Sequence, residues 1–190
     1  MELPLWSVAH SRTLRRFLVR SRYVLALLLA AGLVWFARPH WFWWAVGVSF
    51  CGELIQLWSA SSLQKNEVFQ PRGPYTLIRN PMYLGRFFVI LGMVAVPASV
   101  YTLIGYVLLF LPYVVARVSR EERKLAQLFG EPYIAYLARV PRFIPMPGRA
   151  YRAHGSPFSF RWELVVRNGE HLNALGLVAF YILVRLRLAL

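Results

Sequence analysis

Polar side chains that could bind a charged ligand lie at the edges of two hydrophobic runs in this 190-residue chain. The first group lies in GPYTLIRNPMYLGR, residues 73–86, and the second in RVSREE, residues 117–122. A guanidinium can hold a carboxylate or phosphate, and a carboxylate can accept hydrogen bonds from an ammonium group or a ribose hydroxyl. The residue types of both stretches therefore suit the binding of a charged small molecule.

The prolines of the first stretch predict how its backbone enters the hydrophobic run. Pro74 and Pro81 fix φ and disfavour helix in the residue before each, so we expect irregular backbone through Asn80. A helix that begins near Pro81 would present free N–H groups to an anion. The plainer interpretation is that Asn80 caps this helix, Pro81 takes its first position and the tyrosines lie at the membrane interface.

The second stretch also has two interpretations. Arg117 and Glu121 are four residues apart, so on a helix they share a face and could simply pair with each other. Alternatively, Glu121 accepts hydrogen bonds from a ligand while Arg117 holds an acidic group. A further carboxylate, Glu53, lies inside an apolar run, where it is either functional or a hydrogen-bonding partner between helices.

Motifs of several soluble enzyme classes do not occur in the sequence. There is no glycine-rich dinucleotide or phosphate-binding loop, no zinc-protease motif and no nucleophile elbow. The four histidines have no metal-binding spacing, and the single cysteine, Cys51, lies in an apolar run. We therefore expect no metal site and no disulfide framework.

The composition indicates a membrane protein. Hydrophobic residues make up 58% of the chain and are concentrated in five runs. These runs cover residues 23–37, 41–58, 83–97, 100–116 and 172–184. With their interfacial flanking residues they approach the roughly 20 residues of a membrane-spanning helix. We predict an all-α, polytopic membrane protein with about five transmembrane helices, the first four arranged as two hairpins.

The basic residues are distributed unevenly around these runs. If the N-terminus is cytoplasmic, residues 1–22, 59–86 and 117–170 face the cytoplasm and hold 19 of the 22 Lys and Arg residues. A net charge of +14 on such a chain favours anionic lipid headgroups over nucleic acid as a partner. We therefore expect an integral protein of a prokaryotic plasma membrane, without a cleavable signal peptide and with both polar stretches on the cytoplasmic side.

The segment after the fourth run is predicted to be helical with one break. Apolar residues recur at spacings of three and four through residues 125–140, while Gly130 and Pro132 predict a break and a new helix start. Residues 141–149, PRFIPMPGR, are not expected to be helical, and residues 156–171 could form an amphipathic helix on the membrane surface.

Three motifs carry a resemblance to a known family. LWSASSLQKNE, GPYTLIRNPMYLG and EERKLAQLFGEPYIAYLARVPRFIP, within residues 53–145, are similar to the integral membrane methyltransferases related to isoprenylcysteine carboxyl methyltransferase and to phospholipid N-methyltransferases. The resemblance implies a single methyltransferase domain. Its parts would be an N-terminal hairpin (1–58), a catalytic core with a cytoplasmic cofactor-binding segment (59–145), and a surface helix followed by a membrane helix (146–190).

The resemblance also implies S-adenosylmethionine as methyl donor, bound at the cytoplasmic membrane edge. The side chains and backbone that would line its pocket belong to Gln64, Glu67, Val68, Phe69, Gln70, Tyr75, Asn80, Pro81, Met82, Tyr83, Glu121, Tyr133 and Tyr136. The catalytic group would comprise Asn80, Arg117, Glu121 and Glu122, with Arg117 facing the methyl acceptor. Many family members have histidine in place of Asn80, and an asparagine does not titrate, which counts against a base at this position.

The expected function is methylation of a lipid or lipid-modified acceptor, as in isoprenylcysteine carboxyl O-methylation. Phospholipid N-methylation, a sterol-type membrane reductase and a non-enzymatic helical scaffold are the alternatives. A carboxylate acceptor needs no base and suits Arg117, whereas an amine must lose a proton to Glu121, Glu122 or Glu53. The expected partners are the lipid bilayer and a lipophilic acceptor, with no nucleic acid and no obligate protein partner.

Overall fold

The described part of the chain is entirely helical in its regular elements, which confirms the predicted all-α class. A computed structural model describes residues 12–63, 69, 71–146 and 160–190. The helices are α1 (Arg12–Trp35), α2 (Phe42–Ser62), α3 (Pro81–Ala95), α4 (Val100–Phe129), α5 (Glu131–Arg139), α6 (Trp162–Asn168) and α7 (Glu170–Ala189), with short 3-10 turns η2 (Pro39–Trp41) and η3 (Gly73–Thr76).

Two of these helices, α4 and α7, are each long and apolar enough to cross a membrane. The segments Val24–Trp35 and Pro39–Ser62 meet the same criterion only as a pair, and they are bent by 108° where they join. Helix α3 is apolar but has only 15 residues. By length and composition, the described residues thus hold two candidate membrane spans, or three if the bent pair counts as one. The expected five membrane-spanning helices remain a prediction.

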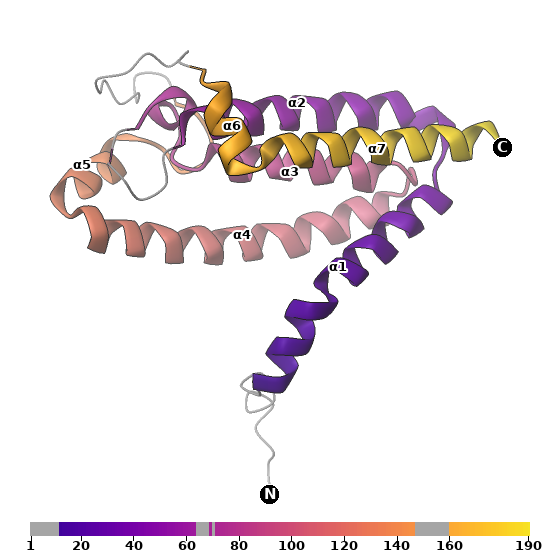
Figure 1. Ribbon diagram of the computed structural model, residues 1–190, viewed down its shortest axis with the longest axis horizontal. Coiled ribbons are helices and arrows are strands. Elements are labelled where there is room, and N and C mark those ends of the chain that lie inside the picture. The colour runs from indigo at the N-terminus through magenta and orange to yellow at the C-terminus, as the bar shows by residue number, and fades with distance from the viewer. Residues whose placement is uncertain (1–11, 64–68, 70, 147–159) are drawn as a thin grey trace, which may run out of the picture.

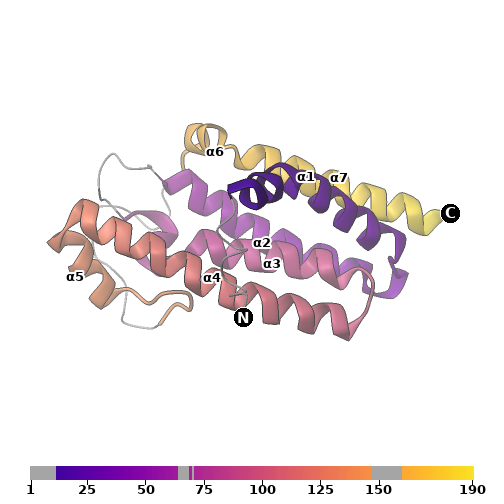
Figure 2. The same ribbon diagram turned by 90° about the horizontal axis from the view of Figure 1, so that it is seen from below.

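Helices α2 and α3 form the tightest contact of the bundle. They lie side by side in Figures 1 and 2, with α7 against α2 and α4 along α3. A Cβ atom added at Gly52 would lie 2.5 Å from the Val89 nitrogen, and one at Gly85 would lie 2.7 Å from the Gly52 carbonyl oxygen. Only glycine allows the two backbones to approach so closely, which is a common device between membrane helices.

A small polar cluster joins α7 to this pair. The Ser49 hydroxyl of α2 donates to the Val89 carbonyl of α3 at 2.8 Å. Its oxygen also lies 2.7 Å from the Tyr181 hydroxyl of α7, and Tyr181 donates to the Ala45 carbonyl. These bonds satisfy hydroxyl groups that would otherwise be buried in an apolar environment, so they fix the packing of three helices.

One end of the bundle gathers the predicted polar stretches. The end of α2, the start of α3, the end of α4, and α5, α6 and the start of α7 all lie at this end, on the left in Figure 1. Helix α4 continues to Phe129, well beyond the predicted hydrophobic run. The predicted break then occurs at Gly130, whose φ of +60° favours glycine, and α5 follows.

The prediction of one surface helix over residues 156–171 is wrong. Helix α6 covers only Trp162–Asn168, and Gly169 ends it in the left-handed conformation with φ of +78°. A glycine in that conformation terminates a helix, and α7 begins at the next residue, Glu170. Residues 156–159 of the predicted helix lie outside the described part of the chain.

Candidate functional site

Glu122 of α4 is the centre of a buried ionic cluster. This residue is only 7% exposed to solvent. Oε1 accepts a hydrogen bond from Asn80 Nδ2 at 3.2 Å and lies 3.2 Å from Arg79 Nη1. Oε2 accepts from Arg142 Nε at 3.1 Å, and Nη2 of the same guanidinium also contacts it. One carboxylate therefore ties the segments before α3 and after α5 to the end of α4.

Asn80 precedes α3 as the sequence predicts, but its side chain does not cap the helix. Pro81 takes the first helical position, and no side chain caps the first turn. The Asn80 amide instead donates to Glu122 Oε1 and, at 3.4 Å, to the Arg142 carbonyl. The predicted capping role of the Asn80 side chain is therefore wrong: a cap would accept through Oδ1, but the side chain is oriented so that its Nδ2 donates to Glu122, and Oδ1 makes no bond to the first turn.

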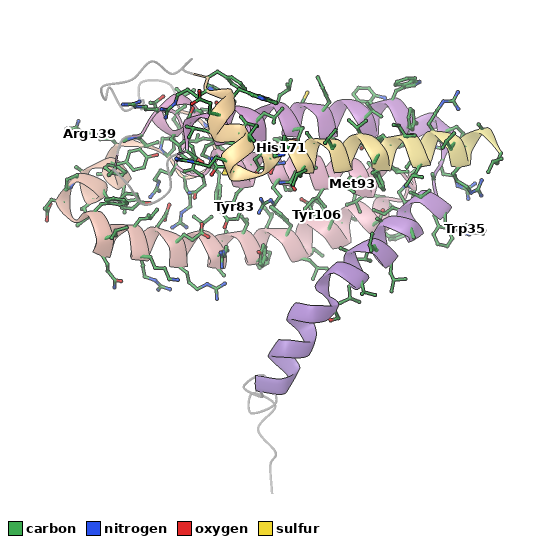
Figure 3. The ribbon with its side chains drawn as sticks, viewed as in Figure 1. Trp35, Tyr83, Met93, Tyr106, Arg139 and His171 are labelled. Atoms are coloured by element: carbon green, nitrogen blue, oxygen red, sulfur yellow. The ribbon has the colours of Figure 1, made fainter. Side chains whose placement is uncertain are left out.

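A second, more exposed group lies beside the first. Glu121 Oε1 accepts from the Tyr83 hydroxyl at 3.0 Å and pairs with Arg117 Nε at 2.9 Å. Arg117 Nε also lies 3.4 Å from the Tyr83 hydroxyl oxygen. The predicted pairing of Arg117 with Glu121 is confirmed. Their side chains are 50% and 37% exposed, so this pair remains open to a ligand (Figure 3 shows Tyr83 between α3 and α4).

Aromatic side chains cover the Glu122 cluster from α5. The Phe69 ring packs against Phe129, Tyr133 and Tyr136, with centroids 5.6, 5.2 and 5.3 Å away. Tyr136 donates to the Tyr75 carbonyl at 2.7 Å. Burial, with a smaller contribution from Glu122, raises the pKa of Tyr133 to about 12. These contacts fasten α5 over the loop that precedes α3.

The structure brings most of the predicted site residues to this end of the bundle. They belong to α3, the loop before it, the second half of α4, and α5, and are Phe69, Tyr75, Asn80, Pro81, Met82, Tyr83, Arg117, Glu121, Glu122, Tyr133 and Tyr136. Gln64, Glu67, Val68 and Gln70 lie outside the described residues. Tyr133 and Tyr136 are buried against protein, whereas Glu121 and Arg117 are accessible.

Two arginines of the site were missed by the sequence analysis. The guanidinium groups of Arg79 and Arg142 hold Glu122, and the backbone N–H of Arg79 also donates to the Pro141 carbonyl at 2.9 Å. Each lies within a motif already singled out, RNP and VPRFIP. A carboxylate that becomes buried is costly without a cation. The need of Glu122 for a positively charged partner could therefore have pointed to these arginines.

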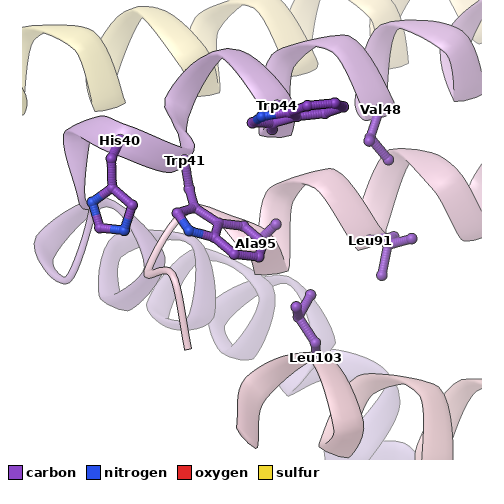
Figure 4. A pocket seen from close by; sticks show the side chains of 7 residues that line it. All are labelled: His40, Trp41, Trp44, Val48, Leu91, Ala95 and Leu103. Atoms are coloured by element: carbon purple, nitrogen blue, oxygen red, sulfur yellow. The ribbon is translucent and has the colours of Figure 1, made fainter. Parts of the chain in front are cut away.

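Apolar grooves surround the bundle away from this site. One of about 920 Å³ lies between α1, α3 and α4 and is lined by aliphatic side chains of α1, together with Ile90 and Met93 of α3 and Tyr106 of α4. Ile90 and Tyr106 also belong to the cluster that contains Tyr83 and Phe87, so apolar side chains are continuous from the groove to the site. A smaller groove of about 470 Å³ is lined by Trp41 and Trp44 among others (Figure 4).

Comparisons with known proteins match one family model and several curated relatives. The model of the family "Phospholipid methyltransferase" matches residues 21–132. The cobalt-zinc-cadmium resistance protein CzcN of Cupriavidus metallidurans is 31% identical over 150 residues, which are 71% of this chain and 68% of that protein. Protein-S-isoprenylcysteine O-methyltransferase B of Arabidopsis thaliana is 23% identical over 154 residues, 70% of this chain and 78% of that protein.

A further relative matches a shorter part of the chain. Protein-S-isoprenylcysteine O-methyltransferase of Xenopus laevis is 33% identical over 73 residues, which are 38% of this chain and only 25% of that protein. No solved structure matches the chain. The family match nevertheless covers more than half of the chain and includes every residue from Asn80 to Glu122. The chain therefore belongs to the phospholipid methyltransferase family and is an integral membrane methyltransferase.

Proposed function

We propose that this protein transfers a methyl group from S-adenosylmethionine to a lipid or lipid-modified acceptor, at the end of the bundle where α3 and α4 meet. The observation that carries the proposal is the accessible group formed by Tyr83, Arg117 and Glu121 beside the buried Glu122 cluster. The family membership and the names of the isoprenylcysteine O-methyltransferase relatives support a methyltransferase over the reductase and the scaffold.

The residues present suit the donor. S-Adenosylmethionine carries ribose hydroxyls, an ammonium group and a carboxylate, and it would supply a methyl group already activated on sulfur. Glu121 Oε2 makes no hydrogen bond with any described residue and would accept from a hydroxyl or ammonium group. In the first turn of α3, Pro81 has no N–H and the N–H groups of Tyr83 and Leu84 donate to the Asn80 carbonyl, so the Met82 N–H would receive the carboxylate. The pocket would be completed by Phe69, Tyr75, Pro81, Met82 and Tyr83, together with Gln64, Glu67, Val68 and Gln70. The buried Tyr133 and Tyr136 would support it from behind Phe69 and Tyr75.

Arg117 and Asn80 would have different roles in this site. The half-exposed guanidinium of Arg117 would orient the acceptor, because it reaches beyond Glu121 toward solvent. The amide of Asn80 is committed to Glu122 and would position α3 rather than transfer a proton. Catalysis would then depend mainly on aligning the acceptor with the activated methyl group.

The apolar groove between α1, α3 and α4 supports a lipophilic acceptor. Its volume of about 920 Å³ is in the range of small-molecule sites, and its lining is continuous with the Tyr83 cluster. An acceptor could keep its apolar tail in this groove while its reactive head reaches Glu121 and Arg117. The names of the relatives favour a carboxylate on a prenylated cysteine, and the family description favours a phospholipid amine as the second candidate.

We place this end of the molecule on the cytoplasmic side of a prokaryotic plasma membrane. Outside α1, the described Lys and Arg residues of segments 71–142 and 161–167 belong to this end, whereas Arg38, Arg185 and Arg187 belong to segments at the opposite end (Figure 1). Such an asymmetry is typical of cytoplasmic loops.

Transfer of a labelled methyl group tests the proposed function. The full chain in lipid nanodiscs would be incubated with S-adenosylmethionine labelled on its methyl group and with a bacterial lipid extract. We expect label in an extractable lipid, a strong loss of labelling in Glu121→Gln, and no loss in Glu131→Gln, which changes an exposed glutamate of α5. A folded wild-type chain that labels no lipid or lipid-modified peptide would contradict the proposal.

A further inference from the structure

A pair of buried carboxylates lies between α2 and α7. Glu53 is 5% exposed and Glu170 is 4% exposed. Glu53 Oε2 accepts from Gln56 Nε2 at 3.2 Å, and Glu170 Oε2 accepts from Asn173 Nδ2 at 2.7 Å. Each bond comes from a neutral amide on the same helix. Neither carboxylate forms an ion pair with any residue that the structure describes.

Two acceptor atoms of this cluster lack a hydrogen-bond donor among the described residues. Glu53 Oε1 and Gln56 Oε1 are both buried and have no hydrogen-bond partner among the described residues. Both atoms are acceptors, so the group that would satisfy them is a donor. Buried carboxylates are ordinarily paired with a cation, because removing an unpaired charge from water is costly. The missing partner is therefore expected to donate hydrogen bonds and to be positively charged.

Electrostatic and packing contacts connect this pair to the segment that precedes α3 and to the start of α3. Burial raises the pKa of Tyr75, and the negative charges of Glu170 and Glu121 add to the rise, so the Tyr75 phenol lies within electrostatic reach of both. The side chain of Gln56 packs against Gly85 near the start of α3. Figure 3 shows His171, the neighbour of Glu170, at the start of α7.

We propose, on the basis of the methyltransferase function proposed above, that Glu53, Gln56 and Glu170 bind the ammonium group of a substrate. An ammonium group has three N–H donors, which match Glu53 Oε1, Gln56 Oε1 and the Glu170 carboxylate. Two like charges attract such a group and repel a carboxylate. The cation could be the amino group of the methyl donor or that of an ethanolamine-type lipid headgroup, since both present the same chemistry.

Binding measurements on the full chain in detergent test this site. The probes are S-adenosylhomocysteine, its analogue without the amino group, short-chain phosphatidylethanolamine, and short-chain phosphatidylglycerol as a lipid without an amine. The variants are Glu53→Gln and Glu170→Gln, which keep the side-chain shape and remove the charge. Glu163→Gln, at an exposed glutamate of α6, is the matched control. Circular dichroism would verify that each variant is folded.

We expect each Gln variant to lower the affinity for one amine-bearing probe about tenfold, as the loss of a charge-assisted hydrogen bond would do. If the lipid supplies the cation, phosphatidylethanolamine binding falls, and binding of S-adenosylhomocysteine and phosphatidylglycerol does not change. If the methyl donor supplies it, S-adenosylhomocysteine binding falls, while the analogue without the amino group binds wild type and variants equally.

Two results would overturn the site. The first is that Glu53→Gln and Glu170→Gln bind both amine-bearing probes with the same affinity as wild type and the control Glu163→Gln. The pair of carboxylates would then hold a proton in place of a cation. The other is that the wild-type chain binds neither probe, which would contradict the proposed function as well. A wild type that binds phosphatidylethanolamine through these glutamates but not S-adenosylhomocysteine would contradict the proposed function alone.

Discussion

Glu122 and Glu53 are two buried glutamates with opposite surroundings. They are 7% and 5% exposed, so burial does not distinguish them. Glu122 contacts two guanidinium groups and an amide, whereas Glu53 contacts one amide of its own helix. The same residue type at the same depth can therefore have both oxygens paired within the protein or leave one acceptor unpaired. The cations and hydrogen-bond donors that surround each carboxylate decide which arrangement occurs.

The largest expected effect is the loss of the Glu122 charge. In Glu122→Gln, Arg79 and Arg142 would remain near the loop without a carboxylate, and removing one partner of a buried pair costs several kcal/mol. Because the Arg142 side chain is 34% exposed, we expect a loss of about 3 kcal/mol in the free energy of unfolding. Denaturant titration monitored by circular dichroism measures this loss.

The matched control for that experiment is Glu131→Gln, since Glu131 is exposed and close in sequence. We expect it to change the free energy of unfolding by less than about 0.5 kcal/mol. An equally small change in Glu122→Gln would mean that the ionic cluster does not hold α3, α4 and the segment after α5 together.

The next effect concerns the packing that buries Glu53. Gly52 lies directly before it and against α3, so the added methyl group in Gly52→Ala would meet the Val89 nitrogen and the Gly85 carbonyl. We expect a loss of about 2 kcal/mol, because the helices must separate. Gly47→Ala, on the same helix with no atom within 4 Å, should instead gain up to about 1 kcal/mol from helix propensity. Equal effects of the two changes in thermal unfolding would contradict the close packing.

A smaller effect of opposite sign is expected for Glu53 itself. Glu53→Gln removes a buried charge that has no cation, so we expect the ligand-free protein to gain about 1 kcal/mol. The same denaturant titration applies. A loss as large as that of Glu122→Gln would remove the distinction between the two glutamates and would mean that Glu53 has a structural partner.

The smallest effect is a shift in tyrosine ionisation. The pKa of Tyr133 is raised by burial and then by Glu122, to about 12 from an ordinary 10.0. The folded protein therefore keeps this proton longer than the unfolded chain, and the resulting stability is complete below pH 10 and is lost as the pH rises toward 12. In Glu122→Gln the negative charge is gone and the arginines remain, so the pKa of Tyr133 should fall.

The tyrosinate absorbance of wild type and Glu122→Gln, each compared with its own Tyr133→Phe variant, would isolate this group. An unchanged Tyr133 titration in Glu122→Gln would show that the phenol does not sense the ionic cluster. Glu53→Gln is the control, because Glu53 is not among the charges that act on Tyr133.

Features that depend on neighbours along the chain were predictable from the sequence. Pro81 marks the start of α3, Gly130 marks the break before α5, and the spacing of Arg117 and Glu121 predicts their pairing. Each follows from the conformational limits of one residue or from the period of a helix.

Contacts between distant segments were not predictable in the same way. Arg142 reaches Glu122 only because α5 folds back, and Glu170 approaches Glu53 only because α7 packs against α2. The Asn80 side chain turns from its expected cap to Glu122 for the same reason. The hydrogen-bonding chemistry of each residue was evident from its type, but its partner was set by tertiary packing.

The most direct test of the account is calorimetric titration of the full chain with S-adenosylhomocysteine in detergent. We predict saturable binding at a single site, and about tenfold weaker binding in Glu121→Gln, in which the accessible carboxylate between Tyr83 and Arg117 is neutralised. Absence of binding by folded wild-type protein would contradict the central claim that this end of the bundle holds the methyl donor.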